Sequence, residues 1–349
     1  MAVEKKVLDI TKRSEDGQRL LSTFHRKIAG QEDATIVLSN IVESWKAGFC
    51  DPSKPMGNAL FLGPTGSGKT RIVEVLAEAL FGDENAMLKV NCGEFQMDHD
   101  IAKLIGSPPG YIGHRETTPY LSQANLNKYH TEKWPISLLL FDEIEKSSDT
   151  LWTLLLGILD KATMRTGDNQ QINFSSTIVV LTSNLGAKQM EKAVEGGMGF
   201  LTPSKSAEKT HEELSSIATD SMKRKFTPEF VNRLNNIVVF HTLTEGQIRD
   251  ILDIELERLR HRLIHSSKVF FTFAVTASAK RTLLKEGYSK VYGARHLKRA
   301  IETRISTPLS HLVASGQIAD GDGININEVG SKDFEFALQP DMNVLLRLH

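Results

Sequence analysis

The segment GPTGSGKT, from Gly63 to Thr70, constrains the possible folds of this chain most strongly. It fits the pattern G-x-x-x-x-G-K-[ST], and it lies between an apolar stretch at 59–62 and an amphipathic stretch at 71–81. A glycine-rich loop between a strand and a helix lets backbone N–H groups and the helix start surround a phosphate. The spacing predicts a phosphate-binding loop in an α/β fold. The alternative is a glycine-rich turn that binds nothing.

Each part of this loop has an expected role. Lys69 is expected to reach the β- and γ-phosphates of a nucleotide, and the hydroxyl of Thr70 to ligate Mg²⁺. ATP and Mg²⁺ are therefore the expected cofactors. The nucleotide-binding residues predicted for this loop and the first helical turn are Gly63, Pro64, Thr65, Gly66, Ser67, Gly68, Lys69, Thr70 and Arg71.

A second motif, ISLLLFDE at 136–143, is an apolar run that ends in two acidic residues. Asp142 is expected to belong to the Mg²⁺ shell, and Glu143 to orient and polarise the attacking water. An apolar run followed by two acids is also typical of an ordinary strand end before a helix cap. Together with the phosphate-binding loop, however, the motif indicates hydrolysis of a nucleoside triphosphate rather than binding alone.

Three further polar residues follow or precede expected structural elements. Asn184 follows the strand expected at 177–181, where its amide could lie beside the γ-phosphate. Arg233 precedes the last strand of this region, and Arg295 begins an amphipathic helix. Arginines at such places can neutralise transition-state charge, one from a neighbouring subunit and one from the same chain. Taken singly, the asparagine is also typical of a helix cap and the arginines of a protein surface.

The segment SPPGYIGH at 107–114 places Tyr111 between two glycines, after two prolines. This pattern predicts a mobile tip on a stiff stem, away from the phosphate-binding loop. The alternative is a turn whose tyrosine packs on the core.

Hydrophobic patterning divides the chain into three parts. Unbroken apolar runs alternate with helical stretches, as in a parallel sheet covered on both faces, and this predicts an α/β domain over 27–242. Residues 1–26 are expected to form a helical lead-in, and 243–349 a smaller α+β domain that opens with a capping box at Thr244 and Gln247. The segment 185–210 is expected to be a loop with one helical turn at most.

Composition excludes several classes of protein. Hydrophobic residues make up 40% of the 349 positions, which suits a globular protein with a core. The net charge of −1 gives no general attraction to nucleic acid or to anionic membranes. The N-terminus has no secretion signal, and two cysteines cannot form a disulfide framework. We therefore expect a cytoplasmic protein that binds neither nucleic acid nor membrane.

In this order and spacing, the motifs resemble those of the AAA+ ATPases. More narrowly, they resemble the second ATPase module of the Clp-type unfoldases and disaggregases, the ClpA, ClpB and ClpC group. The similarity covers about residues 27–330, here as a single module. It implies an AAA+ P-loop domain with a small C-terminal lid, and assembly into a six-membered ring. The stretches that carry it are GQEDA, LFLGPTGSGKT, SPPGYIG, LLLFDEIEK, LTSNLGA, FTPEFVNRLNNIVVFH and GYSKVYGARHLKRAI.

The resemblance also implies roles for single residues. Asn184 is similar to the residue called sensor one, and Arg295 to the sensor-two arginine. Arg233 is similar to the arginine finger that completes the site of a neighbouring subunit. Ile28, Ala29 and Ile248 occupy positions where the family lines its adenine pocket.

Two loops have expected partners through the same resemblance. Gly110, Tyr111, Ile112 and Gly113 resemble the axial pore loop that grips a threaded polypeptide, although Arg-Glu-Thr-Thr follows where the family usually has Glu-Glu-Gly-Gly. Met198, Gly199 and Phe200 resemble the tripeptide with which peptidase-linked relatives dock a barrel peptidase. The alternative is a glycine-rich loop whose phenylalanine packs locally.

The implied function is an ATP-dependent unfoldase that threads protein substrates through a ring, with a peptidase or an adaptor protein as a further partner. Two alternatives use the same ATPase core. In one, the nucleotide state controls assembly with a specific protein and no chain is threaded. In the other, the ring moves on nucleic acid, which would require basic and aromatic residues on the pore-facing loops.

Overall fold

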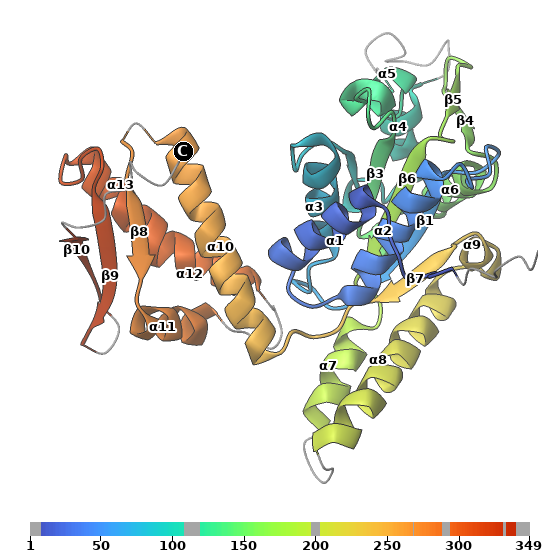
Figure 1. Ribbon diagram of the computed structural model, residues 1–349. Coiled ribbons are helices and arrows are strands. Elements are labelled where there is room, and N and C mark those ends of the chain that lie inside the picture. The colour runs from blue at the N-terminus through green and yellow to red at the C-terminus, as the bar shows by residue number, and fades with distance from the viewer. Residues whose placement is uncertain are drawn as a thin grey trace, which may run out of the picture.

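Figure 1 shows a computed structural model of the chain, in which the described residues form a large N-terminal and a small C-terminal domain. The structure describes residues 8–107, 119–196, 203–267, 269–287, 294–330 and 333–339. A short segment after β7 links the two domains (Figure 1). None of the helices in these ranges is both long and apolar enough to cross a membrane.

The large domain is built on a five-stranded sheet in the order β2-β3-β6-β1-β7, and all four pairings are parallel. The predicted parallel sheet is therefore confirmed. Its carboxyl edge gathers the loops that follow Leu62, Asp142 and Ser183, which is where open α/β sheets bind ligands. The strands are β1 (Gly57–Leu62), β2 (Leu88–Asn91), β3 (Ser137–Asp142), β6 (Thr177–Ser183) and β7 (Asn236–Val239).

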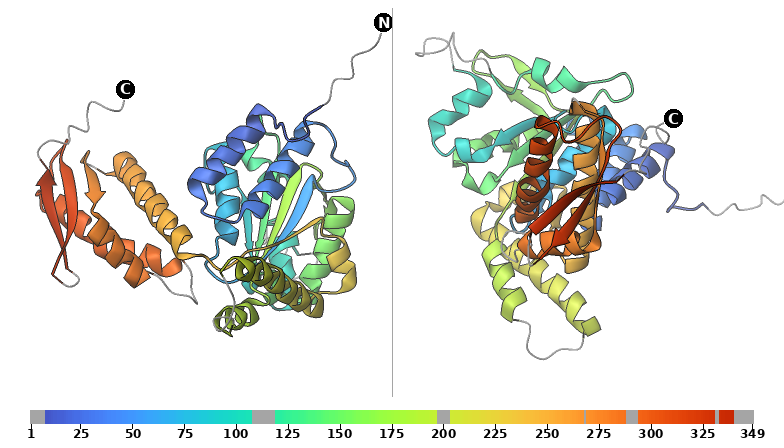
Figure 2. Two further views of the ribbon diagram at one scale, coloured as in Figure 1. Left: turned by 60° about the horizontal axis from the view of Figure 1, so that its bottom comes forward. Right: turned by 90° about the vertical axis from the view of Figure 1, so that its left-hand side faces the viewer.

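Helices cover both faces of this sheet (Figure 2). Because side chains alternate along a strand, Phe61 packs with one set of helices and Leu60 and Leu62 with the other. The first face is covered by α1 (Glu15–Lys27), α2 (Glu32–Lys46) and α3 (Lys69–Phe81). The second is covered by α4 (Ala102–Ile105), α5 (Gln123–Leu126), α6 (Asp149–Lys161), α7 (Ala187–Gly196), α8 (Pro203–Lys225) and α9 (Pro228–Asn232). The antiparallel pair β4 (Thr163–Arg165) and β5 (Gln171–Asn173) follows α6.

Helix α1 packs as part of the large domain. The boundary expected at residue 26 therefore does not separate this helix from the core of that domain. Leu20 and Phe24 are buried in the core that α2 and α3 also form. Ser14 caps the helix by accepting a hydrogen bond from the N–H of Gly17.

The expected loop at 185–210 is wrong, because α7 and α8 form a helical hairpin there (Figure 1). The segment contains many good helix formers (Ala, Lys, Glu, Gln and Met), and its two described glycines, Gly186 and Gly196, lie just before α7 and at its end. Further along α8, Leu214, Ala218 and Met222 recur every four residues and are all buried. Composition alone suggested a loop, whereas this spacing indicates a helix.

The small domain begins at Thr244, where the predicted capping box with Gln247 is present. A three-stranded sheet in the order β10-β9-β8 packs with the helices around buried residues such as Phe273, Ile301 and Ile326. The elements are α10 (Glu245–Ser266), β8 (Thr272–Val275), α11 (Ala277–Gly287), α12 (Arg295–Ile301), a π-helix (Glu302–Ser306), α13 (Thr307–Ala314), β9 (Gly323–Val329) and β10 (Asp333–Gln339).

Candidate active site

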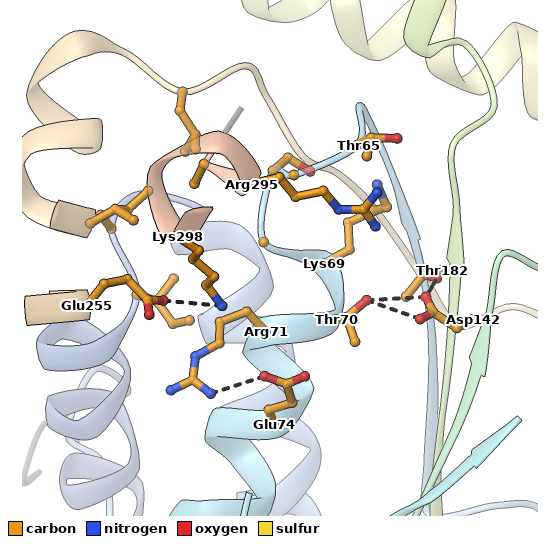
Figure 3. A pocket seen from close by; sticks show the side chains of 18 of the residues that line it. Thr65, Lys69, Thr70, Arg71, Glu74, Asp142, Thr182, Glu255, Arg295 and Lys298 are labelled. Carbon is orange, nitrogen blue, oxygen red and sulfur yellow. Dashed lines mark hydrogen bonds and ion pairs between the residues drawn. The ribbon is translucent and has the colours of Figure 1, made fainter. Parts of the chain in front are cut away.

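A cavity of about 430 Å³ lies where the carboxyl edge of the large sheet meets the small domain. Figure 3 shows the phosphate-binding loop, the end of β3 and helix α12 facing one another across it. Cationic side chains outnumber acidic ones in its lining, which suits an anionic ligand. These side chains are Lys27, Lys69, Arg71, Lys89, Arg295 and Lys298 against Glu74, Asp142, Glu143 and Glu255.

Lys69 is buried inside the phosphate-binding loop. Its Nζ donates to the carbonyl oxygens of Gly63 and Pro64, at 2.7 and 2.8 Å, and to Oδ1 of Asn184 at 2.9 Å. Burial lowers the pKa of Lys69 from its usual 10.5 to about 8, although the nearby carboxylates, Glu145 first among them, act in the opposite direction. The ammonium group is thus poorly hydrated, and its pKa lies close to neutral pH. A bound polyanion would therefore strongly favour its charged form.

Thr70 and Asp142 lie together as a pair of oxygen ligands. The Thr70 hydroxyl donates to the two carboxylate oxygens of Asp142, at 3.2 and 3.4 Å. The hydroxyl of Thr182 donates to the same carboxylate at 2.5 Å, and Lys89 Nζ lies 3.3 Å from it. A hydroxyl and an oriented carboxylate beside a phosphate-binding loop fit Mg²⁺, which prefers hard oxygen ligands and binds through one or two protein groups plus phosphates.

Glu143 is held at the end of β3 by contacts on both its backbone and its side chain. Its backbone is left-handed, with φ of 59°, and its N–H donates to the Thr182 hydroxyl at 3.1 Å. Its Oε1 accepts from Nδ2 of Asn184 at 3.1 Å, and its Oε2 lies 2.6 Å from Nζ of Lys146. Few non-glycine residues adopt this backbone, and such strain often marks a functional site.

Asn184 joins the two halves of the polar cluster. Its Oδ1 accepts from Lys69 and its Nδ2 donates to Glu143, so the amide connects the buried ammonium to the carboxylate. Its backbone N–H donates to Oε1 of Glu145 at 3.1 Å, which fixes the start of the loop after β6.

The small domain provides one wall of the cavity. Arg295, at the start of α12, points toward the phosphate-binding loop on the side of Lys69 and Thr65 (Figure 3). On the same wall, Lys298 Nζ lies 3.3 Å from Oε1 of Glu255, which belongs to α10.

The other end of the cavity is apolar. Ile28 and Ala29, two of the residues expected in an adenine pocket, line it together with Leu243, Ile251 and Ile254 from the linker and α10. Ile248, the third residue predicted for this pocket, is instead buried in the core of the small domain. It belongs to the stripe of α10 formed by Ile248, Leu252, Leu256 and Leu259, whereas Ile251 and Ile254 lie on the adjoining face of the helix.

Arg233 does not line this cavity. It caps the C-terminus of α9, and its Nε lies 3.1 Å from Oδ1 of Asp160 on α6. The two predicted loops, Gly110–Gly113 and Met198–Phe200, lie outside the described residues.

Sequence reasoning missed several residues of the site. Thr182 and Glu145 stand within two motifs, LTSN and DEIEK, in which only the neighbouring residues were assigned roles. Their position directly beside those residues is the signal that could have identified them. For Lys89 and Glu255 the sequence offers no comparable signal, because the contact of Lys89 depends on the pairing of β2 with β3 and that of Glu255 on the packing of α10 and α12 within the small domain.

Comparisons with known proteins agree with this arrangement. Residues 54–237 match the family described as AAA domain (Cdc48 subfamily), and residues 243–326 match the C-terminal, D2-small domain of ClpB protein. The chain is 35% identical over 309 residues to the chaperone protein ClpB of Rhodopirellula baltica. It is 34% identical over 333 residues to the Clp protease ATP-binding subunit ClpC of Staphylococcus epidermidis.

The structural relatives include the Hsp104:casein complex of S. cerevisiae, with a TM-score of 0.77 and 30% sequence identity. That comparison covers 93% of this chain and 53% of the Hsp104 chain. The sequence comparisons cover 88% and 94% of this chain but only 33% of the ClpB and 39% of the ClpC relative. Because the family match spans more than half of this chain, and the second match accounts for most of the small domain, the chain belongs to the AAA+ ATPases and resembles their Clp-type D2 module.

Proposed function

We propose that this chain hydrolyses ATP at the candidate active site and uses the energy to remodel proteins. The observation that supports this most directly is the connected set Lys69, Asn184 and Glu143, with contacts of 2.9 and 3.1 Å. An ammonium group that binds phosphate, an amide and a carboxylate, connected by hydrogen bonds, can hold a γ-phosphate and the attacking water next to each other. A site for binding alone would not require the carboxylate.

The role of each residue follows from its place. Lys69 and the loop amides bind the β- and γ-phosphates, and Glu143 orients the attacking water and draws its proton. Thr70 and Asp142 would hold Mg²⁺, which neutralises phosphate charge when bound. Ile28, Ala29, Ile251 and the other apolar residues at the far end suit a purine base. Arg295, from the small domain, adds positive charge to the cavity, so ATP would bind at the interface between the two domains.

Arg233 is proposed to act on the site of a neighbouring subunit, which makes a ring a condition of activity. Arg233 is not among the residues that line the candidate active site of its own chain. We propose a homohexamer, as the resemblance to the Clp-type modules implies.

Glu143→Gln tests the hydrolysis proposal. The amide keeps the shape of the side chain but cannot accept the proton of the water, so turnover should fall by ~10²-fold or more while ATP still binds. Glu213→Gln, on an exposed part of α8, is the matched control and should keep wild-type turnover. Hydrolysis by Glu143→Gln at the wild-type rate would contradict the assignment.

We further propose that the ring threads polypeptide past Tyr111. The relative solved with casein is a protein complex, which supports a protein rather than a nucleic-acid substrate. Tyr111→Ala should keep ATPase activity and lose translocation of unfolded casein, whereas Tyr111→Phe should keep both. Equal loss of ATPase and translocation in Tyr111→Ala would contradict a role confined to grip.

Docking of a peptidase through Met198–Phe200 is a subsidiary proposal. Deleting these residues should abolish binding of a barrel peptidase and spare ATPase activity. Unchanged peptidase binding after the deletion would mean that any such contact uses another surface.

A further inference from the structure

Arg233 lies at the edge of the sheet opposite to the phosphate-binding loop of its own chain. In the parallel pairing of β1 with β7, Asn236 lies beside Ala59 and Val239 beside Leu62. Arg233 precedes β7, so it lies near Asn58, whereas the phosphate-binding loop starts at Gly63. At ~3.3 Å per residue, the five steps from Asn58 to Gly63 span ~16 Å, which is longer than an arginine side chain.

The side chain of Arg233 has one acidic partner among the described residues. Its Nε lies 3.1 Å from Oδ1 of Asp160, and both side chains are 39% exposed. Because a guanidinium group has five N–H donors in a flat fork, a contact at Nε leaves the two terminal nitrogens to meet an anion outside the subunit. Asp160 therefore restricts the direction of the fork without occupying its tip.

The backbone at Arg233 is held by a buried residue of β1. Asn58 is 2% exposed; its Nδ2 donates to the carbonyl oxygen of Arg233 at 3.1 Å, and its Oδ1 accepts from the N–H of Asn235 at 2.7 Å. Its own carbonyl oxygen accepts from Nδ2 of Asn236 at 3.0 Å. A buried amide with both ends satisfied is costly to displace, so this contact fixes the chain on either side of Leu234.

Aromatic packing fixes α9 against α6 as well. Phe230 is buried, its ring centroid lies 5.2 Å from that of Phe226, and Phe226 lies 5.1 Å from Trp152 of α6. Asp160 is on the same helix as Trp152. The arginine and its acidic partner are thus carried by elements that pack on each other.

We propose that Asp160 and Asn58 are positioning residues for Arg233, Asp160 through the guanidinium group and Asn58 through the backbone. This rests on the role of Arg233 proposed above. Asn58 lies on β1, which leads into the phosphate-binding loop, and Asp160 lies on α6, which follows Glu143 and its short helix. The arginine offered to the neighbouring site is therefore attached to the strand that precedes one nucleotide motif of its own subunit and to the helix that follows the other.

A double-mutant cycle tests the part played by Asp160. Arg233→Ala should abolish most turnover, and Asp160→Asn should lower kcat by about tenfold with KM for ATP unchanged, because a misplaced group costs up to ~10²-fold. In the Arg233→Ala background, Asp160→Asn should have no further effect, since it acts through the arginine. Asp160→Glu, which keeps the carboxylate, should recover part of the loss.

Asp253→Asn is the matched control, because Asp253 also forms an exposed ion pair, with Lys280 at 2.6 Å, but in the small domain. It should leave kcat unchanged. Full additivity of Asp160→Asn with Arg233→Ala, or a kcat of Asp160→Asn equal to that of the control, would overturn the proposal. If Arg233→Ala itself keeps wild-type turnover, the proposed role of Arg233 is wrong and the positioning role of Asp160 is wrong with it. If only Arg233→Ala lowers turnover, the role of Arg233 stands and the positioning role alone is wrong.

Hydrogen–deuterium exchange on the wild-type protein tests the part played by Asn58, without a variant that might fail to fold. The amide of Asn235 donates to a buried side chain, so we expect it to exchange slowly, at a rate similar to the β7 amides. Exchange of Asn235 as fast as that of exposed loop amides would overturn the backbone anchor.

Discussion

At the scale of single residues, the site depends on polar side chains that hold one another in place at the end of the sheet. Thr182 shows this most clearly, because its hydroxyl accepts from the N–H of Glu143 and donates to Asp142. One residue thus orients both the proposed metal ligand and the proposed base. Asn184 has a similar double role between Lys69 and Glu143.

Thr182→Val should weaken Mg²⁺ binding with little change in shape. Asp142 would lose one of the donors that orient it, and loss of such a supporting hydrogen bond typically costs ~10- to 100-fold in metal affinity or activity. The Mg²⁺ concentration that gives half-maximal ATPase activity should therefore rise. Thr177→Val, the same change at the far end of β6, is the control. An equal shift in both variants would mean that the effect is one of strand stability.

ATP affinity should fall as the pH rises above 8, because the pKa of Lys69 is lowered to about 8 in the free protein. Below that pH the lysine is charged before and after binding, so it adds no pH dependence to the affinity. Above it, phosphate restores the charge, binding takes up a proton, and affinity falls by up to ~10-fold per pH unit. Calorimetry in two buffers of different ionisation enthalpy measures this uptake. Affinity unchanged from pH 7 to 10 would contradict it, and Lys69→Arg should abolish the step.

At the scale of elements, α1 is a structural part of the large domain. Asp16, in its first turn, accepts from Nζ of Lys133 at 2.7 Å and pairs with Lys46 of α2. These contacts lower the pKa of Asp16 from 3.8 to about 2, Lys133 contributing most. They connect α1 to α2 and to the segment before β3.

Asp16→Asn should lower the melting temperature at pH 7, but not near pH 2. The folded-state pKa lies below the unfolded value, so the stabilisation is fully present above about pH 4 and is lost as the pH falls through 2. Melting curves of both proteins over this range measure the difference. Asp250→Asn, at an exposed position on α10, is the control. A difference that persists at pH 2 would show that the charge of Asp16 is not the cause.

At the scale of the whole molecule, ionic contacts join the two domains beside the nucleotide cavity. Glu84, after α3, lies 2.7 Å from Arg71 of the large domain and 2.5 Å from Arg258 on α10. Arg295, on α12 of the small domain, points toward the phosphate-binding loop (Figure 3). The lining of the cavity is therefore complete only while the small domain lies against the large one, since residues of both domains form it.

Glu84→Gln should speed nucleotide release, because it removes the charge that holds Arg258 to the large domain. We expect a several-fold faster release of fluorescent ADP in stopped-flow experiments, with little change in melting temperature, since exposed ion pairs contribute ~1 kcal/mol or less. Glu286→Gln removes a comparable contact, with Arg304 at 2.6 Å, inside the small domain. Equal release rates in the two variants would contradict a link between the domains.

The sequence predicts those parts of the molecule in which a local pattern has one physical meaning. The phosphate-binding loop, the apolar strands and the capping box at Thr244 are of this kind. The hairpin of α7 and α8 was missed because composition outweighed spacing, and the position of Ile248 because two adjoining faces of α10 are both apolar. Asn58 and Asp160 give no local signal at all, since their contacts join residues far apart in the chain.

The most direct test of a site completed between subunits is the solution mass of Glu143→Gln with and without ATP. This variant should retain bound ATP, and bound ATP should then stabilise the interface between subunits to which Arg233 contributes. With ATP, we expect a shift from 38.8 kDa to six times that mass, and adding Arg233→Ala should weaken the shift. A mass that stays at 38.8 kDa with saturating ATP, at every protein concentration, would contradict a self-sufficient ring.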